Sequence, residues 1–125
     1  MADITPPVPA DHQIIQGYGD GGFRIAGQDY VGSVIVTALE TSPWDVPAID
    51  TIDIDNLLVA LKRVPDLTVL LLGTGPTMAP PAPELRTRLR EAGIGLEFMD
   101  TGAACRTFNV LIAEERLAGA ALISI

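Results

Sequence analysis

The spacing of apolar residues divides the chain into a β-rich first third and an alternating second part. The first apolar segments are Gln13–Gln16, Phe23–Ala26 and Tyr30–Thr37. The last of them is β-branched and nearly continuous in apolar residues, which is typical of a strand buried on both faces. Clusters of glycine and aspartate between the segments predict turns. We therefore expect three strands here, the first of which pair as a hairpin or a small side sheet.

The apolar period changes after residue 52, where residues recur at spacings of three and four. This stripe begins directly after Asp53, a good helix N-cap, and Pro65 follows it. Such spacing places all its members on one face of a helix. The members of the stripe are Ile54, Leu57, Leu58, Leu61 and Val64.

Strands and helices alternate through the rest of the chain. In chain order we expect a strand at 67–72, a helix at 83–92, a strand at 95–99, a helix at 102–115 and a strand at 120–125. The order β-β-β-α-β-α-β-α-β implies crossover connections and parallel pairing. The sequence thus predicts a single compact α/β domain over residues 13–125, with a central mixed, mostly parallel sheet flanked by helices and an N-terminal hairpin.

Composition narrows the classes of function. The chain has 125 residues, about one domain, and 48% of them are apolar, enough for one core. Sixteen Asp and Glu residues against eight Lys and Arg give a net charge of −8. This balance argues against binding to nucleic acids or to anionic membranes, because both depend on basic side chains. One cysteine and one histidine exclude a disulfide framework and most His-rich metal sites.

Residues 1–12 carry no recognisable targeting signal. They contain no Lys or Arg and no apolar run, whereas secretory and mitochondrial leaders need basic residues. Pro6, Pro7 and Pro9 predict an extended, flexible lead-in. No apolar stretch in the chain approaches the ~18 residues that span a bilayer. We therefore expect a cytoplasmic protein that does not insert into membranes.

Two polar segments follow predicted strands and are expected to meet at one edge of the sheet. They are Gly73-Thr74-Gly75 and Asp100-Thr101-Gly102, and the second opens a helix. Ligands of parallel sheets bind at the carboxyl ends of the strands, and helix starts attract anions. The better-supported alternative is structural, with the glycines making a turn and Asp100 or Thr101 capping the helix. The predicted polar cleft is lined by Ser33, Gly73, Thr74, Gly75, Asp100, Thr101, Arg106 and Asn109.

No pattern in the sequence identifies a reaction. The Gly73–Gly75 run lacks the G-x-G-x-x-G spacing of dinucleotide-binding folds. Cys105 shares a helical face with apolar residues, which favours a buried, inert thiol, and His12 is too distant along the chain to be its base. No carboxylates pair in a catalytic or metal-binding pattern. We therefore assign no catalytic residue, no metal ligand and no cofactor.

Two further features are interpreted as structural. Arg86 and Arg90 form a small basic stripe beside a Glu84–Arg88 ion pair, and we expect a solvated helix face. We expect Trp44 to anchor the loop that leaves the third strand, and the alternative is that it serves as a contact residue for a partner.

Several segments of the sequence together match a known pattern, and the most specific of them is the block from Met99 to Leu111. The segments are Phe23-Arg24-Ile25, Gly32-Ser33-Val34, Trp44, Gly73-Thr74-Gly75, Met99 to Leu111, and Glu115-Arg116. With these segments the chain resembles a family of small α/β domains of unknown function over about residues 13–125. This family includes the mitochondrial complex I assembly factor 3 and the adipogenesis-associated domain proteins.

The resemblance implies a single-domain α/β fold and no agreed enzymatic activity, so no catalytic residue is carried over. It also implies that mitochondrial members act through protein partners during assembly of a respiratory complex. Two hypotheses stay open. The favoured one is a non-enzymatic interaction or assembly protein with an exposed apolar surface near Trp44 or residues 76–83. The alternative is a small-molecule-binding protein or enzyme that uses the polar cleft.

Overall fold

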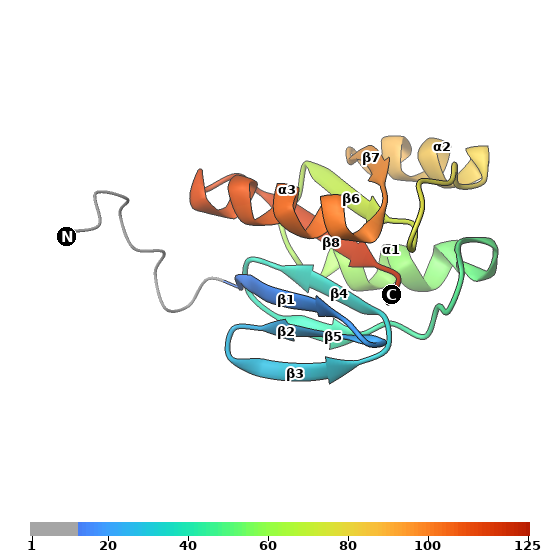
Figure 1. Ribbon diagram of the computed structural model, residues 1–125. Coiled ribbons are helices and arrows are strands. Elements are labelled where there is room, and N and C mark those ends of the chain that lie inside the picture. Colours follow the sequence, from blue (N-terminus) through green and yellow to red (C-terminus); the bar gives the residue numbers. More distant parts are fainter. Residues whose placement is uncertain (1–12) are drawn as a thin grey trace.

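The computed structural model describes residues 13–125, which form two β-sheets and three α-helices (Figure 1). The lead-in expected over residues 1–12 lies outside the described residues. In chain order the elements are β1 (Ile15–Gly19), β2 (Gly22–Ile25), β3 (Gln28–Val31), β4 (Val34–Thr37), β5 (Thr41–Pro43), the 3-10 helix η1 (Ile49–Thr51), α1 (Ile54–Lys62), β6 (Val69–Gly73), α2 (Pro83–Glu91), β7 (Gly95–Met99), α3 (Thr101–Ala113) and β8 (Ala118–Leu122).

The first sheet is a small antiparallel sheet with strand order β1-β2-β3. Asp20 and Gly21 connect β1 to β2 with φ angles of 53° and 79°. Glycine takes such angles without steric cost, and aspartate tolerates them better than most residues. The N-terminal hairpin expected from the glycine-rich turn is therefore confirmed.

The second sheet has five strands in the order β5-β4-β8-β6-β7. Strands β8, β6 and β7 are parallel, whereas β4 runs antiparallel to both of its neighbours. The mixed sheet and its flanking helices confirm the predicted α/β class. Strands β5 and β7 form its two edges.

Side chains that alternate along the central strands divide the core into two halves. Leu70 and Leu72 of β6 pack with the buried leucines of α1 and α2, and Leu71 packs with Phe108 of α3 on the other face. The three-stranded sheet contributes Phe23 to this second half. The molecule therefore has three layers, with α1 and α2 on one face and α3 with the small sheet on the other (Figure 1).

Aspartates cap two helices as the sequence indicates. The Asn56 amide donates to Asp53 at the start of α1 (3.1 Å), and the Ala103 amide donates to Asp100 at the start of α3 (2.9 Å). Asp100 is therefore the cap of α3, and Thr101, the other candidate, is its first helical residue.

The segment expected to form one strand at Tyr30–Thr37 is two strands in different sheets. Gly32 separates β3 from β4. Its φ of 85° is an angle that glycine adopts readily and that β-branched residues do not.

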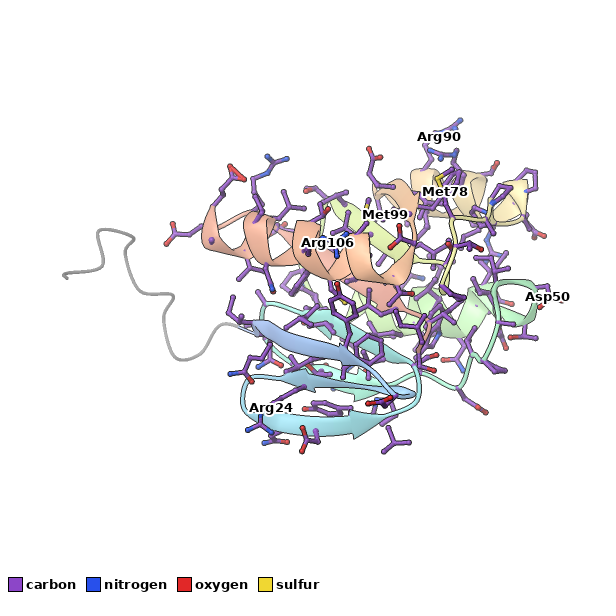
Figure 2. The ribbon with its side chains drawn as sticks, viewed as in Figure 1. Arg24, Asp50, Met78, Arg90, Met99 and Arg106 are labelled. Atoms are coloured by element: carbon purple, nitrogen blue, oxygen red, sulfur yellow. The ribbon has the colours of Figure 1, made fainter. Side chains whose placement is uncertain are left out.

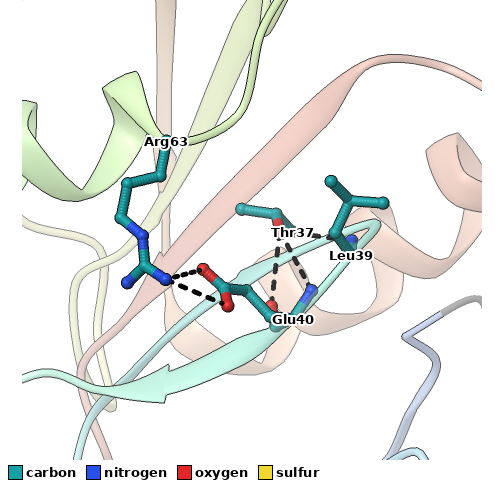
Figure 3. Close-up of polar contacts among 4 residues, drawn as sticks. All are labelled: Thr37, Leu39, Glu40 and Arg63. Carbon is teal, nitrogen blue, oxygen red and sulfur yellow. Dashed lines mark hydrogen bonds and ion pairs between the residues drawn. The ribbon is translucent and has the colours of Figure 1, made fainter.

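The short edge strand β5 was not expected from the sequence either. It forms a hairpin with β4, in which Thr37 Oγ1 accepts hydrogen bonds from the Leu39 and Glu40 amides, both at 3.3 Å (Figure 3). Arg63, at the end of α1, pairs with Glu40 at 3.2 Å.

None of the helices formed by residues 13–125 has both the length and the apolar character needed to cross a membrane.

Candidate functional site

The loops that follow β6 and β7 lie against each other, as predicted for the carboxyl edge of the sheet. The Gly75 amide donates to Thr101 Oγ1 (3.0 Å), and the Thr101 amide donates back to the Gly75 carbonyl (2.9 Å). The Thr74 amide donates to the Met99 carbonyl at 2.8 Å. These bonds join the two candidate segments directly.

Thr101 also joins both loops to the end of β8. Its side chain is 0% exposed, and Oγ1 donates to the Ile123 carbonyl at 2.7 Å. The Ile123 amide in turn donates to the Gly73 carbonyl at 3.0 Å. A side chain at Gly73 would bring its Cβ to 3.0 Å from the Thr101 Cα, a contact tighter than ordinary packing, and glycine avoids it.

Ser33 holds the next residue of the same C-terminal segment. Its hydroxyl accepts from the Ser124 amide (3.0 Å) and donates to the Val46 carbonyl (2.6 Å). Ser33 also lines a shallow hollow of about 300 Å³ beside Trp44 and Pro47. Ser33 and Thr101 therefore bind consecutive residues after β8, and both hydroxyls are used in doing so.

Asn109 attaches the small sheet to α3. Its side-chain amide donates to the Ile15 carbonyl (2.8 Å), and its side-chain oxygen accepts from the Ile15 amide (2.9 Å). The Asn109 side chain thus bonds both backbone groups of Ile15, as a neighbouring strand would. The sequence analysis placed Asn109 in the polar cleft, but in the structure both of its side-chain polar atoms bond to β1.

Arg106 is the exposed member of the set. It lies on α3 (Figure 2), and its guanidinium donates to the Tyr18 hydroxyl of β1 at 2.6 Å. Asp100 is occupied as the helix cap. The Thr74 hydroxyl donates to the Thr77 carbonyl at 2.8 Å and accepts from the Ala79 amide at 3.1 Å.

The structure therefore brings together Ser33, Gly73–Gly75, Asp100 and Thr101 where β6, β7 and β8 end, and their polar groups mostly bond to one another or to nearby backbone. It places Arg106 and Asn109 further along α3, where they bond to β1. Buried polar groups need such partners, because an unpaired one costs about 1–3 kcal/mol. The arrangement orders the loops and the chain end. Binding of a small molecule at this edge stays a prediction.

The chemistry of Cys105 follows from its position in the core. The side chain is 1% exposed. Burial raises its pKa to about 12, although the nearby charge of Arg106 acts in the opposite direction. A thiol with this pKa is protonated at neutral pH and is a poor nucleophile. Within residues 13–125, no three His, Cys, Asp or Glu side chains are grouped to hold a metal ion.

The two predicted partner surfaces differ in exposure. Trp44 is only 5% exposed and belongs to the core, so a contact surface built on this side chain was a wrong expectation. It anchors its loop, as the favoured interpretation of the sequence expected. The segment 76–83 is largely exposed, and Met78 has 66% of its surface accessible.

The sequence interpretation overlooked a groove beside this segment. Pro80–Pro83, Arg86, Arg90 and Phe98 line a hollow of about 380 Å³ between α2 and β7. Arg86 and Arg90 were interpreted as a solvated face. Their helical spacing was visible in the sequence, but the edge strand that they flank was not.

The comparison with known proteins gives the family. Residues 15–123 match the model of a family described as "Protein of unknown function (DUF498/DUF598)". The chain belongs to this family. The resemblance noted from the sequence is thereby confirmed.

Several proteins similar to this chain have names that state their role. Proteins from Xenopus tropicalis and Danio rerio, 32% and 36% identical, are both named NADH dehydrogenase (ubiquinone) 1 alpha subcomplex assembly factor 3. The matches cover 91% and 88% of this chain but 62% and 63% of those proteins. The chain therefore spans less than two thirds of the length of these relatives.

Solved structures share the fold over nearly the whole chain. One is a crystal structure from Bartonella henselae described as an outer membrane protein, with 36% identity, a TM-score of 0.83, and coverage of 92% of this chain and 97% of that one. Another is an NMR structure of a Mth938-like domain from Bordetella pertussis, with 28% identity and a TM-score of 0.81. It covers 98% of this chain, and 92% of that chain is matched.

Proposed function

We propose that this chain is a non-enzymatic interaction domain that binds a protein partner during assembly of a respiratory NADH dehydrogenase. The observation that carries the proposal is the closed hydrogen-bond network at the carboxyl edge of the sheet. Thr101, Ser33 and Asn109 each place their side-chain polar atoms on backbone groups of the chain itself. Polar groups committed in this way order a structure, whereas an enzyme site keeps donors and acceptors directed at a substrate.

The thiol supports the same conclusion. A catalytic cysteine needs exposure and a lowered pKa, and Cys105 has neither. The names of the vertebrate relatives supply the process, because those proteins are named as assembly factors of NADH dehydrogenase. An assembly factor acts by binding and releasing subunits, which requires surface rather than catalytic groups.

The experiment is deletion of the gene in the source organism, followed by native gel electrophoresis of solubilised membranes with in-gel staining for NADH dehydrogenase activity. We expect less of the mature complex and an accumulation of partly assembled forms. Expression of the wild-type chain restores the mature complex, and so does Cys105→Ala if the thiol has no chemical role. A normal amount of mature complex in the deletion strain would overturn the proposal.

A further inference from the structure

A groove runs between α2 and the free edge of β7. Two hollows lie along it, of about 380 and 300 Å³, and both are lined by Arg86 and Arg90. The first extends past Phe98 to the proline segment 80–83, and the second runs past Leu96. Figure 1 shows α2 and β7 on the side of the molecule away from the small sheet. The shared arginines make the two hollows one groove.

The outer edge of β7 carries backbone groups that an additional strand can use. The Gly95 amide and the Met99 carbonyl point toward the β6 side, where they bond to Thr68 and Thr74. Because successive residues of a strand direct their backbone groups to opposite sides, Leu96 and Phe98 direct theirs outward. The Leu96 carbonyl accepts a hydrogen bond from Arg86 at 3.2 Å. Residues 13–125 supply no other partner to this outward edge.

The groove is locally positive, although the chain as a whole is negatively charged. The chain has a net charge of −8, and Arg24, Arg63 and Arg88 are each paired with a carboxylate. Arg86 and Arg90 have no carboxylate within 4.0 Å in the described part of the chain. They are therefore a local pair of unneutralised cations, and the Arg86 guanidinium lies 5.9 Å from the centre of the Phe98 ring.

Helix geometry separates these arginines from the carboxylates of α2. Glu84, Arg88 and Glu91 share one stripe, which faces α1, since Arg88 pairs with Asp55 at 2.6 Å. Arg86 and Arg90 lie on the opposite side of the buried Leu85 and Leu89. Arg90 projects from α2 at the outer side of the molecule, away from α1 (Figure 2).

We propose that this groove binds an extended acidic segment of a partner protein, which adds to β7 as an extra strand and places carboxylates on Arg86 and Arg90. The inference deepens the proposed function and rests on it for the biological partner. Strand addition supplies affinity through backbone hydrogen bonds and specificity through alternate side chains. In the partner segment, the residues that face α2 are acidic. The partner residues on the other face of the added strand, which approach Glu97, are neutral or basic.

A protein segment fits this surface better than a nucleic acid does. Nucleic-acid binding draws on many Lys and Arg contacts with phosphates, and here two cations stand on a chain of net charge −8. A free sheet edge also matches a peptide backbone, whose amides and carbonyls alternate at the same spacing.

The first test uses a fluorescein-labelled peptide of about nine residues, the length of a long strand, with Glu at every second position and Val or Thr between. We expect saturable binding, with NMR shifts concentrated at the amides of Leu96 and Phe98. A scrambled peptide of the same composition, with its glutamates adjacent, binds about tenfold more weakly because it cannot present one acidic face. A peptide with Pro at its centre is weakened similarly because it lacks a ladder amide.

Charge reversal on the protein supplies the matched variants. Arg90→Glu weakens binding of the alternating peptide by at least about tenfold, whereas Arg116→Glu, an equal charge change in the connection between α3 and β8, leaves it unchanged. Urea unfolding checks that both variants keep the stability of the wild type. Equal binding of the scrambled peptide, full binding by Arg90→Glu, or preferential binding of single-stranded RNA would overturn the inference.

The deletion strain separates this inference from the proposed function. We expect the double variant Arg86→Glu/Arg90→Glu to fail in restoring the mature complex, whereas Arg116→Glu restores it. If the wild-type chain is needed and the double variant restores fully, the groove inference is wrong and the proposed function stands. If the deletion has no effect, the proposed function is wrong, and the peptide titration alone decides whether the groove binds acidic strands.

Discussion

Replacing Thr101 by valine removes one buried hydroxyl while keeping the shape of the side chain. In the native structure, Thr101 Oγ1 accepts from the Gly75 amide at 3.0 Å and donates to the Ile123 carbonyl at 2.7 Å. Thr101→Val leaves both backbone groups without this partner in a fully buried position. At about 1–3 kcal/mol for each unsatisfied group, the expected loss is about 2–6 kcal/mol. This is a large share of the ~5–15 kcal/mol that stabilises a typical domain.

The matched control is Thr101→Ser, which keeps the hydroxyl and deletes one methyl group, at a cost of about 1 kcal/mol. Urea unfolding followed by circular dichroism measures both variants, and the slope with denaturant shows whether the transition remains two-state. Hydrogen exchange of the Gly75 amide reports the local opening. A Thr101→Val variant within about 0.5 kcal/mol of Thr101→Ser would refute the claim that this hydroxyl holds the edge of the sheet together.

Three other substitutions test neighbouring parts of the account. Gly73→Ala forces a Cβ to within 3.0 Å of the Thr101 backbone and is expected to cost about 1–3 kcal/mol in urea unfolding, whereas Gly17→Ala, with nothing within 4 Å, changes little; equal effects would contradict the close approach. Asn109→Asp loses the donor to the Ile15 carbonyl, so we expect a loss of about 1–3 kcal/mol and faster hydrogen exchange in β1; a loss no larger than that of Val110→Asp, on the exposed side of α3, argues against this attachment. Cys105→Ala lowers the free energy of unfolding by about 1 kcal/mol at pH 7. Folding raises the thiol pKa from 9.0 to about 12, so the thiol's contribution is complete below pH 9 and falls as the pH rises toward 12, a fall that the alanine variant lacks. Rapid labelling of native Cys105 by a thiol reagent at pH 8 would contradict its burial.

Local signals predicted most of the elements. The period of three and four after Asp53 is a property of the helix itself, and the Asp53 side chain caps it as expected. The strand at 95–99 has the predicted bounds because Gly93 and Asp100 flank it with strong stop and start signals. Where the signal was continuous, the boundary was missed. The apolar run at Tyr30–Thr37 concealed the change of sheet at Gly32, although the glycine itself marked the position.

The candidate site was predictable only in part, because its bonds are not local. Adjacency of the loops after β6 and β7 follows from parallel pairing, which the alternation of elements indicates. Asn109 bonds to Ile15, which is 94 residues away in the chain, and Thr101 bonds to Ile123, which is 22 residues away. No spacing rule specifies them. The groove was missed for a similar reason, since the edge position of β7 depends on the strand order of the folded sheet.

The most direct test of the central claim is photo-crosslinking inside the source cell. A benzoylphenylalanine replaces Thr87, an exposed residue that lines the groove, and in a control chain it replaces Arg116. Mass spectrometry of the crosslinked products identifies the protein and the segment attached. We predict that position 87 crosslinks to an acidic, extended segment of an NADH dehydrogenase subunit or of another of its assembly proteins, and that position 116 does not. Absence of any protein crosslink from position 87, in a cell that needs the chain for assembly, would contradict the account.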